Sequence, residues 1–229
     1  MKKGRLYVVA TPIGNLEDIT LRAIDILKKV VFVLAEDTRE SKKLLDRYKI
    51  NTQLISYRDQ NHERMIGKIF EKLDMGLDLA LVSDNGTPLI SDPGYKLVKA
   101  LKEKEYEVIT IPGPSAITSA LSISGLPTDR FIFLGFLPKS DSKREKIIEQ
   151  YLILEDTLVI YESPNRVLQL LELVNNLDKA ITVSAIRDMT KKRENSYYGK
   201  IESVIKQLKQ EDFENNPHGE WVIILSNKI

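Results

Sequence analysis

The chain has 229 residues, 42% hydrophobic and 29% charged, which suffices for one large domain or two small ones. It has no cysteine and only two distant histidines, which excludes disulfides and a cysteine nucleophile and argues against zinc, so we expect no metal site. Its 34 Lys and Arg almost balance its 33 Asp and Glu, and the net charge of +1 excludes a nucleic-acid binder that relies on bulk positive charge.

In the first half, short apolar runs alternate with amphipathic stretches. The pattern predicts strands at residues 6–10, 31–35, 77–82 and 107–111, with helices around 21–27, 41–48, 62–73, 93–101 and 114–122. Asn61 and Asp92 are expected to cap two of these helices. Apolar strands that alternate with helices predict a parallel sheet covered by helices. No apolar run approaches the ~20 residues of a membrane span and no signal peptide is evident, so we expect a soluble, cytoplasmic protein.

Gly125-Leu126-Pro127-Thr128 interrupts this alternation, and we place a domain boundary there, with domains at 1–124 and 125–229. The second half is also of α/β type, and a short strand at 195–200 favours some antiparallel pairing. Its helices are expected to open at a Ser142…Glu145 capping box and at Ser163. Further strands are predicted at residues 131–134, 157–161, 183–186 and 220–225.

Four loops of the first half, each after a predicted strand, are rich in turn residues: 11–15, 36–39, 83–88 and 112–115. Any one of them is explained equally well as an ordinary turn. Four at the carboxyl edge of one parallel sheet favour a binding cleft. No Walker-type loop is present, and Pro12 occupies the place of a pyrophosphate-binding glycine. The polar groups of Thr11, Asp37 and Asp84 instead suit a ligand with hydroxyls and positive charge.

Several motifs occur in order along nearly the whole chain. They are ATPIGN (10–15), DITLRA (18–23), AEDTR (35–39), SDNGTPLISDPGY (83–95), PGPSA (112–116), SGLPTDRFIFLGFLP (124–138) and YESPNR (161–166). Together they resemble the ribosomal RNA small subunit methyltransferase I family of the tetrapyrrole methylase superfamily. Asn165 departs from the family's commoner histidine, so no imidazole base is expected there.

The resemblance implies that S-adenosyl-L-methionine donates a methyl group to the ribose 2′-hydroxyl of a cytidine. That cytidine would lie in the decoding region of 16S rRNA, in the small ribosomal subunit. The implied fold has two α/β domains, with a mostly parallel sheet in the first, a mixed sheet in the second and the cofactor cleft between them. The implied assembly is a homodimer.

The expected cofactor-binding residues are those carried over from the superfamily, together with the carboxylate of Asp84. Gly86 would allow a close backbone approach, and Ser115 lies near a helix start that suits a carboxylate. Ile13 and Ile90 suit an adenine or a methionine chain, with plain core packing as the alternative. The full expected set is Ile13, Asp84, Gly86, Thr87, Ile90, Ser115, Ala116 and Tyr161.

Methyl transfer from a sulfonium is an in-line displacement that needs alignment and proton removal. Glu36, Asp37 and Lys191 are the catalytic candidates, with Asp84 and Glu162 as further orienting carboxylates. Turn capping or a solvated charge is the alternative for each of them. No nucleophile–base pair can be assigned from the sequence.

RNA contact is expected from guanidinium and ammonium groups near the cleft. Arg39 and Arg166 suit phosphate or ribose, with an ion pair to a neighbouring carboxylate as the alternative. Two basic clusters, at 139–146 and 191–193, have a solvated surface as their alternative. The expected RNA-binding residues are Arg39, Lys143, Arg144, Arg166, Lys192 and Arg193.

Two other interpretations stay open: a small-molecule methylase that acts on a tetrapyrrole-like ring, and a noncatalytic RNA-binding module. The AEDTR and YESPNR segments favour the RNA enzyme. His62 is expected on a helix surface and His218 in a loop, and neither is assigned a role.

Overall fold

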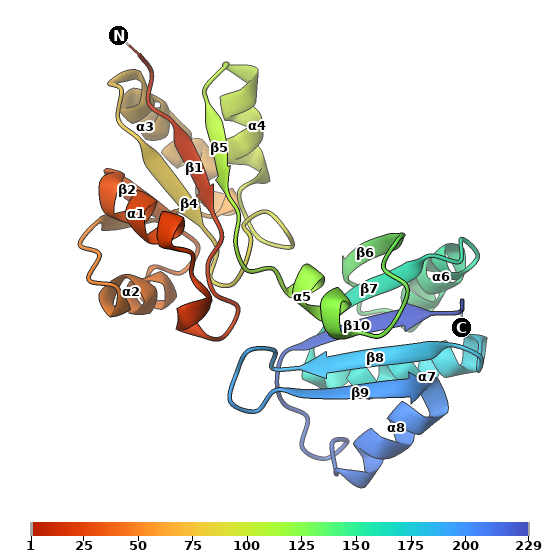
Figure 1. Cartoon of the computed structure of the whole chain (residues 1–229). Helices are drawn as coiled ribbons and strands as arrows, with labels where there is room; N and C mark the ends of the chain where they lie inside the picture. The colour runs from red at the N-terminus through yellow and green to blue at the C-terminus, as the bar shows by residue number, and fades with distance from the viewer. Residues whose placement is uncertain (1, 229) are drawn as a thin grey trace. The chain divides into compact units, whose positions relative to one another are not determined.

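A computed structural model describes residues 2–228 and divides into two compact units, Met1–Ser115 and Ala116–Ile229 (Figure 1). The division precedes the boundary that we expect at 124/125. Helix α5 (Ala116–Ile123) accounts for the difference, because it contacts strand β10 (Trp221–Ser226) of the second unit. No helix within residues 2–228 is both long and apolar enough to cross a membrane.

The first unit contains a five-stranded, fully parallel sheet in the order β3-β2-β4-β1-β5. Its strands are β1 (Leu6–Val9), β2 (Phe32–Ala35), β3 (Gln53–Ser56), β4 (Leu79–Val82) and β5 (Val108–Ile111). Its α-helices are α1 (Leu21–Lys29), α2 (Thr38–Arg47), α3 (His62–Asp74) and α4 (Tyr95–Glu103). The parallel sheet is confirmed, and β3 is an edge strand that the apolar pattern did not predict.

Alternation along the strands divides the core of this unit into two layers. Val33 and Ala80 point to the face covered by α1 and α2, whereas Leu34 and Leu79 point to the face covered by α3 and α4. Both faces are therefore apolar, as expected for parallel strands. The carboxyl ends of the strands remain as the edge where polar loops gather.

The second unit has a mixed sheet in the order β6-β7-β10-β8-β9, in which only the β6–β7 pair is parallel. The remaining strands are β6 (Phe131–Phe136), β7 (Thr157–Glu162), β8 (Thr182–Arg187) and β9 (Asn195–Lys200). Its further α-helices are α6 (Asp141–Leu152), α7 (Val167–Leu177) and α8 (Ile201–Gln210). The mixed sheet and the short strand at 195–200 are confirmed.

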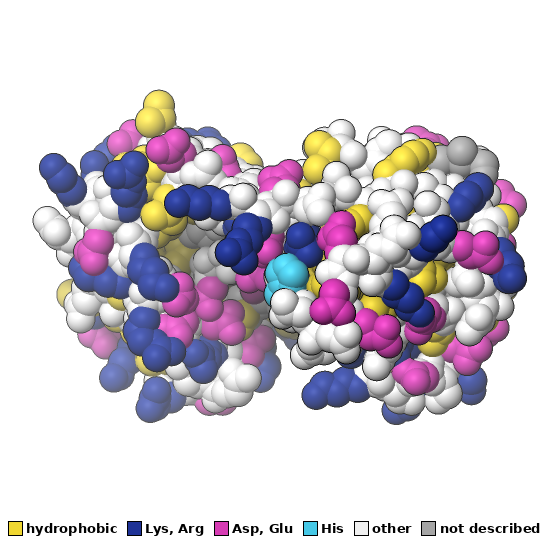
Figure 2. Space-filling view, turned by 90° about the horizontal axis from the view of Figure 1, so that it is seen from below, with side chains coloured by type: hydrophobic (Ala, Val, Ile, Leu, Met, Phe, Trp, Pro, Cys, Tyr) yellow, Lys and Arg dark blue, Asp and Glu magenta, His cyan; other side chains and the backbone are white. Residues whose placement is uncertain are grey.

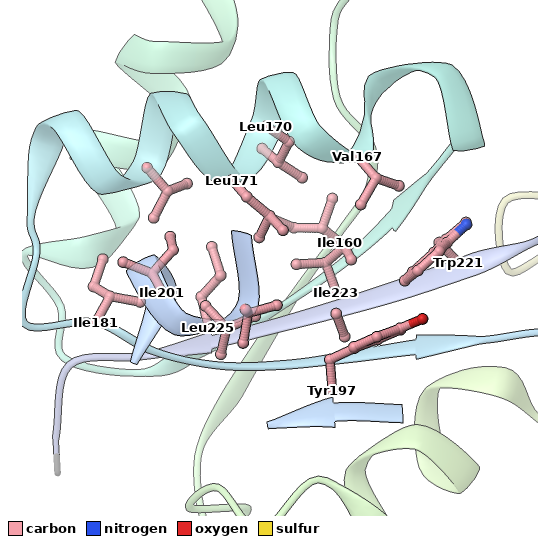
Figure 3. Packing of buried hydrophobic residues seen from close by; sticks show 14 of the residues in the cluster. Ile160, Val167, Leu170, Leu171, Ile181, Tyr197, Ile201, Trp221, Ile223 and Leu225 are labelled. Carbon is pink, nitrogen blue, oxygen red and sulfur yellow. The ribbon is translucent and has the colours of Figure 1, made fainter. Parts of the chain in front are cut away.

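Helices α6, α7 and α8 cover one face of this sheet. Figure 3 shows Leu170 and Leu171 of α7 above Ile160 and Ile223 of the strands, with Trp221 at one end. Burial of these branched side chains stabilises the unit by roughly 1.5–3 kcal/mol for each one. The opposite face meets α5 at β10.

Two predicted helix starts are wrong. Gly94, with φ +132°, precedes α4, so Asp92 lies outside that helix. Ser140 precedes α6, so the expected Ser142…Glu145 capping box lies within the helix.

His62 also departs from its expected surface position. It is buried, and its Nδ1 lies 2.8 Å from the hydroxyl oxygen of Tyr57. His218 is in a loop, as expected.

Candidate active site

The carboxyl edge of the first sheet is held together by hydrogen bonds between loops. Thr11 and Gly86 exchange two backbone hydrogen bonds, of 2.8 and 3.1 Å, which join the loops after β1 and β4. The Thr87 hydroxyl donates to the Pro114 carbonyl at 3.0 Å and joins the loop after β5 to the same group. These bonds link three of the four loops expected to share one edge, and the fourth, at 36–39, is linked through the Asp37 N–H, which donates to Asp84.

Gly86 occupies a backbone conformation that few other residues adopt, with φ +81°. A Cβ atom built at this position would lie 3.1 Å from Cγ2 of Ile13. Ile13 is itself only 7% exposed, so its side chain fills the space beside Gly86. Two of the expected cofactor residues, Ile13 and Gly86, are therefore packed directly against each other.

A cluster of carboxylates lies at the ends of β2 and β4. One oxygen of Asp84 accepts a 3.0 Å hydrogen bond from the Asp37 backbone N–H, and the Arg58 Nε donates to the Glu36 carbonyl at 3.0 Å. Burial raises the pKa of Glu36, as does the negative charge of Asp84, whereas Arg58 lowers it. Glu36 is therefore a better proton acceptor than an ordinary exposed glutamate.

Asp92 joins this cluster from the segment between β4 and α4. Burial raises the pKa of Asp92 to about 7, and the charges of Glu36 and Asp84 add to the effect, whereas a hydrogen bond with Ser83 opposes it. A pKa near neutrality is typical of a group that accepts or gives a proton at physiological pH. The sequence does not single out Asp92 for the site, because Asp92-Pro93 is also the pattern of a helix start.

The segment that carries Asp92 has a constrained backbone. Leu89 and Ser91 have φ values of +73° and +64° although neither is glycine, and Gly94 follows at +132°. The Gly94 N–H also donates to Asp59 at 3.2 Å, which fixes the end of the segment beside the loop after β3. These left-handed residues turn the chain back, so that Asp92 faces the sheet edge.

Asp37 has a structural role that its sequence position alone did not establish. It caps α2 by accepting from the Arg39 backbone N–H at 2.9 Å and also forms an ion pair with the Arg39 side chain at 2.6 Å. The hydrogen bond from the Arg39 side chain lowers the pKa of Asp37 well below its usual range. Asp37 therefore stays charged and is a poor proton acceptor, whereas the Arg39 guanidinium remains highly exposed.

The other expected cofactor residues of this edge differ in exposure. Ile90 is 39% exposed and is therefore open to a ligand, whereas Ile13 is core. Ser115 is half-buried, and Ala116 begins α5. The hydroxyls of Thr11 and Thr87 both donate to backbone carbonyls, so their side chains serve to connect the loops.

In the second unit, the YESPNR segment forms a closed group around a buried carboxylate. The Glu162 side chain is fully buried, and Arg166 pairs with it at 2.6 Å. Arg166 also donates to the Ser163 hydroxyl at 3.1 Å and to the Leu137 carbonyl at 3.3 Å. The ion-pair alternative for Arg166 is thus realised, and this arginine holds the end of β6 to the turn after β7. Tyr161 lies at the end of β7 and is half-buried.

Lys191 lies in a second loop of this unit, between β8 and β9. Its Nζ is 2.7 Å from Glu220 and 3.6 Å from Asp188, and its side chain is 34% exposed. Lys192 and Arg193 beside it are exposed. The loop therefore has two solvent-exposed cations, Lys192 and Arg193, next to Lys191, which is paired with carboxylates.

The basic cluster on α6 separates into two kinds of side chain. Lys143 and Lys146 are exposed, but Arg144 is only 1% exposed, and its Nη2 donates to Asp141. A guanidinium at this depth is shielded from RNA, so the expected RNA contact of Arg144 is not supported. Its spacing from Ile148 and Tyr151, four and seven residues later, places it on the inward helix face.

Basic and acidic side chains are mixed over the face that Figure 2 shows of each unit, in keeping with the near-zero net charge. Among residues 2–228, no group of three or more His, Cys, Asp or Glu side chains has an arrangement that could hold a metal ion. RNA binding by this chain would accordingly depend on local patches.

Comparisons with known proteins agree on one kind of enzyme. A family model described as Tetrapyrrole (Corrin/Porphyrin) Methylases matches residues 5–205. A ribosomal RNA small subunit methyltransferase I from Hydrogenobaculum sp. (strain Y04AAS1) is 45% identical over 98% of this chain and 96% of its own length. The protein of the same name from Thermotoga maritima is 40% identical over 98% of this chain and 99% of its own length. The one from Escherichia coli O157:H7 is 41% identical over 97% of this chain and 78% of its own length.

Solved structures show the same fold at much lower identity. A cobalt precorrin-4 methyltransferase of cobalamin biosynthesis superposes with a TM-score of 0.68 at 15% identity, covering 97% of this chain and 94% of its own. A uroporphyrin-III-C-methyltransferase from Thermus thermophilus superposes with a TM-score of 0.62 at 18% identity, covering 98% of this chain and 95% of its own.

Proposed function

The chain belongs to the ribosomal RNA small subunit methyltransferase I family, within the tetrapyrrole methylases, and on that premise we propose that it methylates the ribose 2′-oxygen of a cytidine in 16S rRNA. The target nucleotide lies in the decoding region of the small ribosomal subunit, and S-adenosyl-L-methionine is the methyl donor. The observation that carries this proposal is the 45% identity over 98% of the chain with a protein of that name. A ribosomal substrate also implies a cytoplasmic enzyme.

The carboxyl edge of the first sheet fits such a donor. S-adenosyl-L-methionine supplies a methyl group on a positively charged sulfonium, and it also carries an ammonium, a carboxylate, ribose hydroxyls and an adenine. Asp84 offers a half-buried carboxylate for positive charge or for hydroxyls, and the exposed part of Ile90 offers an apolar surface. Backbone groups of the loops at 86–87 and 113–116 complete the proposed cofactor-binding residues. Ile13 packs against Gly86 and so supports the first of these loops.

Tyr161 of the second unit is also proposed to contact the cofactor, because the family resemblance implies it. Its place at the carboxyl end of a strand is the kind of position that ligands occupy in α/β proteins.

Removal of the proton from the acceptor hydroxyl is assigned to the carboxylate cluster. A ribose hydroxyl is a weak acid, so an acceptor with a raised pKa is better matched to it than an ordinary carboxylate. Glu36 and Asp92 both have a raised pKa. We therefore assign proton acceptance to this pair, with Asp37 as the cap that fixes the loop of Glu36.

Lys191 is proposed as an orienting group in the second unit. Its Nζ is already held by Glu220 at 2.7 Å, which favours a fixed ammonium that contacts phosphate or ribose over a proton acceptor. Exposed cations supply the RNA contacts in this proposal: Arg39, Lys143, Lys146, Lys192 and Arg193. Arg166 acts indirectly by holding its turn.

A tetrapyrrole substrate is the second candidate, and the structural neighbours of cobalamin and porphyrin metabolism support it. Their identity to this chain is only 15% and 18%, against 40–45% for the rRNA methyltransferases over comparable spans. The difference favours RNA. A homodimer is likewise proposed from the family, and the mass of the protein in solution tests it.

A transfer assay separates the candidates. The protein is incubated with donor labelled in its methyl group and with small ribosomal subunits that lack this modification, and in a parallel reaction with a porphyrin or corrin precursor. Binding of the subunit RNA is measured with and without donor. Label in 16S rRNA is the expected result. Label only in a porphyrin or corrin precursor supports the tetrapyrrole enzyme, and donor-independent RNA binding without any transfer supports the noncatalytic module.

A further inference from the structure

An aromatic side chain at the end of β6 has no role in the site described above. Phe136 is 59% exposed, although Ile132 and Leu134 of the same strand pack against the core of the second unit. Ring centroids of Phe136 and Tyr161 are 5.7 Å apart at 62°, and those of Tyr161 and Phe133 are 4.8 Å apart at 69°. The three rings form an edge-to-face row that fixes the Phe136 ring while leaving much of it open.

A β-bulge explains how this ring reaches the row. Phe133 pairs with Val159, but Gly135 pairs with Ile160 and Phe136 with Tyr161, so β6 uses one residue more than β7. Gly135, with φ +61°, supplies a left-handed residue at this irregularity. If the register of Phe133 with Val159 continued unbroken, Phe136 would pair with the buried Glu162 and face the helices. The bulge turns it to the other face of the sheet, beside Tyr161.

The chain that follows Phe136 carries three exposed lysines. Residues 137–146 contain Lys139, Lys143, Arg144 and Lys146 against Asp141 and Glu145, and the three lysines are exposed. Arg166 holds the carbonyl of Leu137, so the residue after Phe136 is fixed as well. An open ring with cations on the next segment combines a stacking surface with phosphate attraction, which is the composition of single-stranded nucleic-acid sites.

We propose that Phe136 is a stacking platform for an unpaired nucleobase of the RNA substrate. Sequence-specific RNA recognition generally takes bases out of their stack and places them on aromatic rings. Lys139, which is exposed three residues after Phe136 and precedes α6, would then attract the phosphates of that nucleotide. The inference rests on the proposed function and adds the element of the RNA that this unit recognises.

The test measures binding of a short, fluorescently labelled single-stranded oligoribonucleotide. Phe136→Leu keeps an apolar side chain but removes the ring, so we expect binding to weaken about fivefold or more, equivalent to ~1 kcal/mol. Phe136→Tyr keeps a ring and should bind like the parent. Tyr198→Leu is the matched control, since Tyr198 is 55% exposed on β9, the opposite edge strand, and should leave binding unchanged.

Equal RNA binding by Phe136→Leu and the parent would overturn the platform. Donor binding in calorimetry that weakens while RNA binding does not would assign the ring to the cofactor site instead, and a changed solution mass would assign it to contact between copies of the chain. A parent that methylates subunits, together with Phe136→Leu at the same KM for them, contradicts the platform alone. A parent that transfers no methyl group contradicts the proposed function instead.

Discussion

Two carboxylates of the candidate site, Asp37 and Asp92, lie at the same sheet edge and behave in opposite ways. The Asp37 carboxylate accepts from Arg39, which lowers its pKa, whereas burial and like charge raise the pKa of Asp92 to about 7. Surroundings, and not residue type, thus decide which group can exchange a proton near neutral pH. Sequence spacing carries no information on these surroundings.

Asp92 should make folding stability depend on pH. Its folded pKa of about 7 exceeds the ordinary aspartate value of 3.8, so the unfolded chain releases this proton first as pH rises. The stability that neutral Asp92 provides is present below about pH 4 and is lost as pH rises through 7. We expect Asp92→Asn to gain stability over the parent across this range and to reach a plateau above it.

Urea unfolding at a series of pH values measures this difference. Asp25→Asn on α1, which removes an exposed carboxylate, controls for the change of net charge. A stability difference between Asp92→Asn and the parent that stays constant with pH would rule out the elevated pKa.

Proton acceptance by Glu36 and Asp92 should appear in the rate. Glu36→Gln and Asp92→Asn remove acceptors without a large change of volume, and a positioned general base contributes about 10²–10⁴-fold. We expect single-turnover methyl transfer to slow by about that factor, and the parental rate to rise with pH through about 7. Lys43→Ala on the exposed face of α2 is the control. Parental rates in both carboxylate variants would remove the cluster from the chemistry.

Gly86 tests the packing of the loops. Gly86→Ala forces a Cβ into left-handed backbone 3.1 Å from Ile13, which should cost about 1–2 kcal/mol of unfolding free energy and weaken donor binding. Gly67 lies within α3 with no atom within 4 Å of an added Cβ, so Gly67→Ala should instead stabilise by about 0.5–1 kcal/mol. Equal stability of the two variants, measured by urea unfolding, would contradict this account.

At the scale of elements, helix α6 shows what a linear cluster of charges conceals. Lys143 and Lys146 point outward, but Arg144 lies on the inward face with Ile148. If each lysine neutralises one phosphate, Lys143→Ala and Lys146→Ala should each reduce the salt-dependence slope of RNA binding by about one. Donor affinity should remain within about twofold, roughly 0.4 kcal/mol.

Arg144→Ala should behave differently from both lysine variants. Loss of this buried side chain leaves a cavity beside Ile148, so it should lower the unfolding midpoint in urea. An Arg144→Ala protein that is as stable as the parent yet binds RNA with a lower salt slope would restore the expected phosphate contact.

Sequence pattern predicts most elements of this fold because buried parallel strands are short and apolar. It misses β3 because Gln53–Ser56 begins and ends with polar residues on an exposed edge, and it does not predict α8. The start of α4 is misplaced because Gly94, not Asp92, carries the unusual backbone angle. The bulge at Gly135 depends on pairing with β7, which is distant in sequence.

At the scale of the whole molecule, two sheets of different construction divide the work that we propose. The parallel sheet gathers its loops at one carboxyl edge, where hydrogen bonds and carboxylates suit a small, positively charged donor. The mixed sheet carries the buried Glu162–Arg166 pair, the exposed ring of Phe136 and the basic segments at 139–146 and 191–193. Such a division suits an enzyme with one small and one very large substrate.

The most direct test is the chemical position of the transferred methyl group. A 2′-O-methyl ribose lacks the hydroxyl that attacks the neighbouring phosphodiester, so alkaline hydrolysis leaves that one linkage uncut. After reaction with labelled donor and unmodified small subunits, we expect all label in an alkali-stable dinucleotide that begins with cytidine and maps to the decoding region of 16S rRNA. Label in alkali-sensitive mononucleotides, which marks methylation of a base, or an absence of label from 16S rRNA would contradict the proposed reaction.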